Sequence, residues 1–176
     1  ILINCAGAAG NRDILDLPIE TISDGLTLKS FGYLRMAQLV MPYMKRNHWG
    51  RIINIAGSAG TSPDRNNIPT SLANIAILNI TRALSDAVSE YGILVNTVCP
   101  GITNTQRARN MQQARADLEK RHVEDILKEI GQVLPARRIA EPEEVAEVVT
   151  FLASEKCSYM FGSSIYMDGG GRRGTP

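Results

Sequence analysis

The chain has 176 residues, of which 44% are hydrophobic and 21% are charged. A chain of this length buries roughly 70% of the surface that its unfolded form exposes, so we expect a single core. Nineteen Lys and Arg against eighteen Asp and Glu leave a net charge of +1 without a long run of one sign. This balance does not favour a nucleic-acid-binding protein. No uninterrupted apolar stretch of about 18 residues is present, so no membrane partner is expected.

The cysteine and histidine content argues against disulfides and metals. Cys5, Cys99 and Cys157 lie far apart in the sequence and match neither a disulfide framework nor a zinc spacing. His48 and His122 have no Cys or carboxylate cluster around them, so no metal site is expected. The first residues also lack the features of a secretory signal. We therefore expect reduced thiols in a cytoplasmic protein.

Short apolar runs predict strands, and longer periodic runs predict helices. The predicted strands cover residues 1–5, 51–55, 94–98 and 164–167. The predicted helices cover residues 21–47, 68–91 and 141–153, where apolar residues recur at spacings of three and four. Gly92 follows the second of them, at the position where a helix end favours a left-handed residue. Alternating strands and helices with such connections predict an α/β fold, a Rossmann-like doubly wound parallel sheet with right-handed crossovers.

One segment differs in composition from the rest. Residues 105–132 are polar and rich in Arg, Gln, Glu and Lys, with no wide apolar stripe in their first half. One interpretation is a solvated helical insertion. The other is a mobile lid over a ligand cleft, since insertions at the carboxyl ends of strands often control access to a site.

Several motifs in order along the chain carry a family resemblance. They are Asn4-Cys5-Ala6-Gly7, the strand segment 50–55, Val95-Asn-Thr-Val-Cys-Pro-Gly101, and the stretch from Arg138 to Gly170. Together they resemble the short-chain dehydrogenase/reductase family over nearly the whole chain. The resemblance implies an oxidoreductase that uses NAD or NADP and acts on a small carbonyl or alcohol. It also implies a homo-oligomer, a dimer or a tetramer.

Compared with the family pattern, the chain is expected to be incomplete. It contains no Gly-x-Gly-x-x-Gly turn after a strand, the motif that cradles the cofactor pyrophosphate. We expect residues 1–176 to form a single partial Rossmann-like domain, with the polar insertion at about residues 105–132. Either the family's first strands precede Ile1 in a longer protein, or the chain is a half-domain whose open edge pairs with another chain.

The catalytic positions of the family are substituted. By the resemblance, its Tyr position falls on Thr70 and its Lys position on Asn74. Its Ser position falls on Gly57, with Ser58 one residue later, and its Asn position falls on Lys29. A Thr hydroxyl is not a useful general acid, so a contribution of roughly 10²- to 10⁴-fold would be lost with the phenol.

Two function classes follow from these substitutions. The first is an oxidoreductase with an altered or lost catalytic centre, which would need an unusual proton donor such as Ser58 or Tyr33. The second is a non-catalytic relative that serves as a ligand-binding or assembly subunit. Lys29 at the family's Asn position and Asn74 at its Lys position suggest that the two residue types have exchanged places. The resemblance implies that these positions face each other through a water, so we expect the pair to persist with donor and acceptor reversed. The alternative is that Lys29 extends into solvent and Asn74 packs on a helix surface.

Further candidates come from the cofactor side of the family pattern. The resemblance assigns cofactor binding to Asn4, Ala6, Gly7, Pro100, Gly101 and Thr105. Thr105 is equally suited to cap a helix at Gln106, and Asn4 is better suited to couple two strands. For Tyr33 we favour a core position over the cleft, and for His122 a solvated helix face over the substrate.

Overall fold

The computed structural model describes residues 1–7 and 12–173 of the chain. The strands are β1 (Leu2–Asn4), β2 (Gly50–Ile55), β3 (Ile93–Pro100) and β4 (Ser164–Met167). Between β1 and β2 lie α1 (Ile19–Gly25), the π-helical segment η1 (Leu26–Phe31) and α2 (Gly32–Arg46), and between β2 and β3 lie the short 3₁₀ turn η2 (Ser58–Gly60), α3 (Ile68–Val88) and the 3₁₀ turn η3 (Ser89–Tyr91). Between β3 and β4 lie α4 (Gln106–Glu119), α5 (Val123–Gln132) and α6 (Pro142–Ala153). None of the helices within these residues is long and apolar enough to span a membrane.

The four strands form one parallel sheet in the order β1-β2-β3-β4. This confirms the α/β class and the parallel sheet predicted from the alternation. Ile52 of β2 lies between Leu2 of β1 and Val95 of β3, which fixes the register of the sheet. β1 lies at one edge, where the side chains of Ile1 and Ile3 are exposed.

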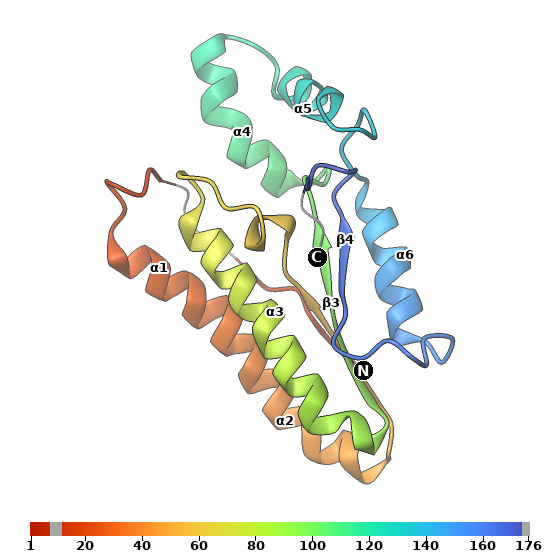
Figure 1. Ribbon diagram of the computed structural model, residues 1–176. Helices are drawn as coiled ribbons and strands as arrows, with labels where there is room; N and C mark the ends of the chain where they lie inside the picture. Colours follow the sequence, from red (N-terminus) through yellow and green to blue (C-terminus); the bar gives the residue numbers. More distant parts are fainter. Residues whose placement is uncertain (8–11, 174–176) are drawn as a thin grey trace.

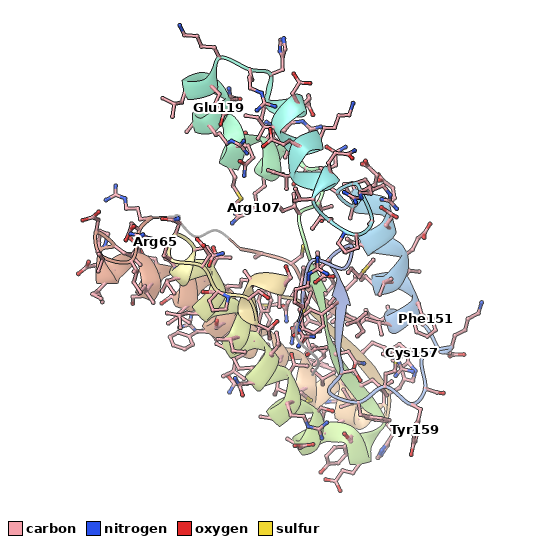
Figure 2. The ribbon with its side chains drawn as sticks, turned by 45° about the horizontal axis from the view of Figure 1, so that its top comes forward. Arg65, Arg107, Glu119, Phe151, Cys157 and Tyr159 are labelled. Atoms are coloured by element: carbon pink, nitrogen blue, oxygen red, sulfur yellow. The ribbon has the colours of Figure 1, made fainter. Side chains whose placement is uncertain are left out.

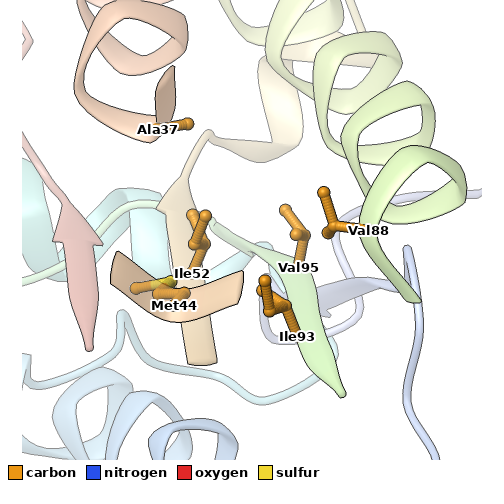
Figure 3. Packing of buried hydrophobic residues seen from close by; sticks show 6 residues of the cluster. All are labelled: Ala37, Met44, Ile52, Val88, Ile93 and Val95. Carbon is orange, nitrogen blue, oxygen red and sulfur yellow. The ribbon is translucent and has the colours of Figure 1, made fainter. Parts of the chain in front are cut away.

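Helices cover both faces of the sheet (Figure 1). On one face, α2 and α3 pack against β2 and β3, and on the other face α6 does so. The core on the first side consists of buried residues from these elements: Ala37, Met44, Ile52, Val88, Ile93 and Val95 (Figure 3). Their neighbours in the strands, Ile53 and Leu94, point to the opposite face and pack with Leu152 of α6. The alternation of side chains along each strand therefore builds two apolar layers.

A set of buried polar side chains ties the sheet to α3. Asn4 of β1 donates to Asn54 Oδ1 of β2 over 2.8 Å. Asn54 in turn donates to Thr81 Oγ1 of α3 at 2.9 Å, and Thr97 of β3 donates to the same oxygen at 2.7 Å. Because all four side chains are buried, each bond is made away from competing water.

The helix predicted over residues 21–47 is continuous from Ile19 to Arg46, but its middle is not α-helical. Residues 26–31 form a π-helical segment. Such segments are rare and occur often at functional sites. This one carries Lys29, which the sequence analysis placed among the substituted catalytic positions.

The polar segment 105–132 folds as the two helices α4 and α5, which lie beyond the carboxyl ends of the strands in Figure 1. Ion pairs join them, with Arg115 bonded to both Glu119 and Glu129 and Arg121 to the same two carboxylates. The pair is therefore a helical hairpin with its own polar contacts. Whether it moves as a lid stays a prediction.

Candidate functional site

A cavity of about 490 Å³ lies at the carboxyl ends of β1, β2 and β3, beneath α4. In open parallel α/β sheets, ligands bind outside this edge of the sheet. Eight of the ten predicted site residues line the cavity: Gly7, Lys29, Ser58, Thr70, Asn74, Pro100, Gly101 and Thr105. Residues from six separate segments of the chain thus meet at one place.

Lys29 and Asn74 are in direct contact. Lys29 Nζ donates to Asn74 Oδ1 over 2.6 Å and to the carbonyl oxygen of Ala56 over 2.9 Å. This confirms the predicted pair with donor and acceptor reversed. The alternative in which Lys29 extends into solvent is wrong. The stem of Lys29 passes Gly7, where a Cβ atom would lie only 3.3 Å from Lys29 Cδ.

The ammonium group of Lys29 sits in an environment that disfavours its charge. Burial and, to a smaller extent, the charge of Arg107 lower the pKa of Lys29 to about 8. The two hydrogen bonds from Nζ stabilise the charged form and work in the opposite direction. At neutral pH the amine is still protonated, but it is a far stronger acid than an exposed lysine.

Gly57 and Asn74 fit each other closely. A Cβ atom at Gly57 would lie 2.8 Å from Asn74 Nδ2, and Asn74 is only 2% exposed. Lys29 bonds to the oxygen of the same amide, so a shift of Asn74 away from position 57 would disturb that hydrogen bond. The absence of a side chain at Gly57, which the resemblance assigns to the family's serine position, leaves space for Asn74. Three of the four substituted positions form one interlocked group.

Ser58 and Thr70 also line the cavity. Ser58 begins the 3₁₀ turn η2, and Thr70 lies in the first turn of α3. Thr70 Oγ1 is buried and has no hydrogen-bond partner among the residues that the structure describes. Among the described residues that line the cavity there is no tyrosine, so no phenol faces it.

Tyr33 is a core residue, as favoured from the sequence. It is 3% exposed, and its hydroxyl donates to the carbonyl oxygens of Ala6 (2.7 Å) and Ile55 (3.2 Å). Burial raises the pKa of Tyr33 well above its ordinary value. Tyr33 does not line the cavity. The suggestion that it donates a proton there is wrong, because its only proton is committed to backbone oxygens.

The residues assigned to the cofactor divide into two groups. Gly7, Pro100, Gly101 and Thr105 line the cavity, whereas Asn4 and Ala6 do not. The side chain of Asn4 couples β1 to β2, and the carbonyl of Ala6 accepts from Tyr33. Thr105 caps α4, since its Oγ1 accepts from the backbone N–H of Ala108. Cofactor binding by these residues stays a prediction.

Arg107 is a charged cavity residue that was not among the site residues predicted from the sequence. It lies in the first turn of α4, and its Nη1 donates to the carbonyl oxygen of Gly7 over 3.3 Å. In Figure 2 it is labelled on the part of α4 nearest the sheet. The segment 105–132 holds several arginines, and its weak periodicity gave no signal for which of them faces the cavity.

His122, by contrast, is exposed at the start of α5, as favoured from the sequence.

The described residues contain no group of three or more His, Cys, Asp or Glu side chains able to hold a metal ion. Of the thiols, Cys5 is exposed at the cavity, and Cys99 and Cys157 are buried. Burial raises the pKa of Cys99 to about 11, so this thiol stays protonated at neutral pH.

Comparison with known proteins places this arrangement in a family. Residues 1–171 match the sequence profile of a family described as enoyl-(acyl carrier protein) reductase. The oxidoreductase UcpA of Salmonella typhimurium is 31% identical over 172 residues, which are 97% of this chain and 64% of that protein. The NADPH-dependent reductase BacG of Bacillus subtilis is 31% identical over 97% of this chain and 66% of its own length. The chain thus spans about two thirds or less of the length of these relatives.

Solved structures give the same result. One of them is the structure of YwfH, described as an NADPH-dependent reductase involved in bacilysin biosynthesis. It superimposes on this chain with a TM-score of 0.91 at 29% sequence identity, and the match covers 99% of this chain and 67% of that one. L-sorbose reductase from Gluconobacter frateurii, solved in complex with NADPH and L-sorbose, gives a TM-score of 0.93 at 25% identity over 99% of this chain and 66% of that one. With the motifs, the parallel sheet and the position of the cavity, these matches show that the chain belongs to the short-chain dehydrogenase/reductase family.

Proposed function

We propose that this chain is part of an oxidoreductase that transfers hydride between a nicotinamide cofactor and a small carbonyl or alcohol, with Lys29 as the proton donor in place of the absent phenol. The observation that carries the proposal is the ammonium of Lys29 in the cavity, bonded to Asn74 and Ala56. The relatives BacG and YwfH, both described as NADPH-dependent reductases, support the choice of cofactor.

The residues at the strand ends fit the nicotinamide end of such a cofactor. Beside Ile55 and Pro100, the residues that line the cavity next to the sheet have short side chains: Cys5, Gly7, Ala56, Gly57 and Gly101. Short side chains leave the backbone open to the face of a flat ring. When bound, NADH or NADPH supplies the hydride. Gly7, Gly101 and Thr105 are the residues we expect to hold the nicotinamide.

Lys29 has the geometry and acidity of a proton donor. An ammonium group has three N–H donors, and two of those of Lys29 are taken by Asn74 and Ala56. The third remains for a substrate oxygen in the cavity that Lys29 lines. A pKa of about 8 matches the operating pH that an efficient general acid needs.

The reduction balances with one proton from Lys29. Hydride adds to the carbonyl carbon, the carbon–oxygen π bond breaks, and the oxygen takes a proton from Nζ. The neutral amine then regains a proton from water. Asn74 holds Nζ in place through Oδ1 in both protonation states, since an amine also donates hydrogen bonds.

Fluorescence titration with NADH and NADPH, followed by turnover on a panel of small carbonyls, tests this function. We expect binding and turnover in the unaltered protein. Lys29→Gln should lower kcat by roughly 10²-fold or more with little change in cofactor affinity. Its matched control is Lys156→Gln, an exposed lysine after α6, which should change neither. The rate of carbonyl reduction should fall as the pH rises through about 8, because the acid form of Lys29 is lost.

A second candidate is a non-catalytic relative that binds a ligand or assembles with other subunits. Thr70 at the tyrosine position and Gly57 at the serine position favour it, since neither supplies an acid. Tight cofactor binding without turnover on any carbonyl would support this candidate and refute the first. The homo-oligomer and the cytoplasmic location expected from the sequence stay predictions. Gel filtration with light scattering measures the former.

A further inference from the structure

The charges around the cavity are all of one sign. Lys29 and Arg107 both line it, and none of the lining residues in the described part of the chain is acidic. Buried charges in proteins are normally paired. Lys29 instead contacts two neutral oxygens, those of Asn74 and Ala56. The cavity thus has a positive potential that its own side chains do not compensate.

Arg107 differs from the arginines around it. Along the helical hairpin α4–α5, the side chains of Arg109, Arg115 and Arg121 each form an ion pair with a glutamate. Within the described residues, Arg107 has no carboxylate at ion-pair distance, and the acceptor of its guanidinium is the Gly7 carbonyl at 3.3 Å. A guanidinium has five N–H donors in a planar fork that matches a carboxylate. Because Arg107 is exposed, most of those donors are open to water or to a ligand.

The start of α4 adds to the same potential. Thr105 caps this helix, and Thr105, Arg107 and Ala108 all line the cavity. The amino end of a helix carries a partial positive charge from its aligned peptide dipoles. Arg107, Lys29 and the start of α4 therefore favour a negative group at one place.

The two cations also act on each other. The charge of Arg107 is one of the causes that lower the pKa of Lys29. An anion held between them would weaken this repulsion and raise the pKa of Lys29 again.

From this arrangement we infer that the substrate of the proposed reaction is an oxo acid, a small carbonyl compound whose carboxylate is bound by Arg107 while its carbonyl oxygen faces Lys29. The inference rests on the proposed function. The cofactor is another source of an anion, since its phosphate groups are negative. The carboxylate is favoured because Arg107 and Lys29 line the same cavity at the strand ends, among residues none of which is acidic in the described part of the chain.

The test compares acids with their neutral methyl esters. Pyruvate and acetoacetate are measured against methyl pyruvate and methyl acetoacetate, both as substrates with NADPH and as ligands of the cofactor-free protein by ligand-observed NMR. The variant is Arg107→Gln. The matched control is Lys120→Gln, which removes one positive charge from the far end of the same helix, about 20 Å away along its axis. Thermal unfolding confirms that both variants are folded.

We expect the unaltered protein to prefer the acids to the esters. We also expect Arg107→Gln to reduce that preference by roughly tenfold or more, with no change in the control. Equal kcat/KM values for acids and esters, or an Arg107→Gln variant with the unaltered preference, would overturn the inference. Weaker NADPH binding in that variant at an unchanged acid-to-ester ratio would also overturn it, and would assign Arg107 to the cofactor phosphate.

The failure of this inference differs from the failure of the proposed function. Turnover of neutral carbonyls without a preference for acids refutes the oxo acid and leaves the oxidoreductase standing. Binding of the acids through Arg107 without any turnover supports the anion site and refutes the oxidoreductase.

Discussion

Lys29→Met changes how the stability of the protein depends on pH. In the unfolded chain Lys29 has its ordinary pKa of 10.5, and in the folded protein this pKa is lowered to about 8. Between these two values the unfolded state binds more protons than the folded state, so the free energy of unfolding rises with pH. The buried ammonium is a cost to folding at neutral pH, and this cost falls as the amine deprotonates. Methionine has a similar shape and no charge, so the variant lacks this dependence.

The size of the effect follows from the two pKa values. One pKa unit corresponds to about 1.4 kcal/mol, so the full shift amounts to roughly 3 kcal/mol. Between pH 7 and pH 10 about 2 kcal/mol of it should be recovered, after a reduction for the partial exposure of the side chain.

Urea unfolding at pH 7, 8.5 and 10 measures this recovery. The unaltered protein should gain about 2 kcal/mol relative to Lys29→Met across this range. Taking the difference between the two proteins removes the contributions of other titrating groups. Lys156→Met, which replaces an exposed lysine, should follow the unaltered protein. If the curves of the unaltered protein and Lys29→Met run parallel, the burial argument for Lys29 is wrong.

Two further substitutions and one labelling experiment probe the site and the core. Gly57→Ala should destabilise the protein by about 1–3 kcal/mol in urea unfolding, since the new methyl group meets Asn74 Nδ2. In the double variant with Asn74→Ala, the loss of free energy of unfolding should be smaller than the sum of the losses in the two single variants. Thr81→Val should lower the free energy of unfolding by about 2–3 kcal/mol in the same assay, because Asn54 and Thr97 both lose their buried acceptor. An unchanged free energy of unfolding would show that water replaces the hydroxyl. In the folded protein only Cys5 should react quickly with a thiol reagent at pH 7.5, since the other two cysteines are buried. A bound nicotinamide cofactor should slow the reaction of Cys5. Fast reaction of a second cysteine would contradict the packing.

The sequence alone was enough to predict the elements and their layers. The strands at 51–55, 94–98 and 164–167 lie within β2, β3 and β4, and the helix at 141–153 corresponds to α6. These elements follow from local patterns of apolar residues, which each segment carries regardless of what it packs against. The parallel sheet also follows, because short connections through helices allow few other arrangements.

Part of the site was predictable as well. The family resemblance implied that Lys29 and Asn74 face each other, and the structure shows them in direct contact. The π-helical segment that carries Lys29 was not predictable, because a single wider turn leaves no mark in apolar spacing. The role of Gly57 was missed for a related reason, since a glycine in a sequence does not tell which side chain occupies the space it leaves.

What the sequence by itself determined is the family and the parallel sheet, and it also led to the prediction that the family's tyrosine position is occupied by Thr70. Only the tertiary structure decided that the ammonium of Lys29 is buried against Asn74, that Tyr33 is bonded to the backbone, and that Arg107 faces the same cavity. These three facts depend on contacts between segments 27 to 100 residues apart. A pKa, a hydrogen-bond partner or a place at a cavity wall is set by neighbours in space, and those neighbours are fixed only when the helices have packed on the sheet.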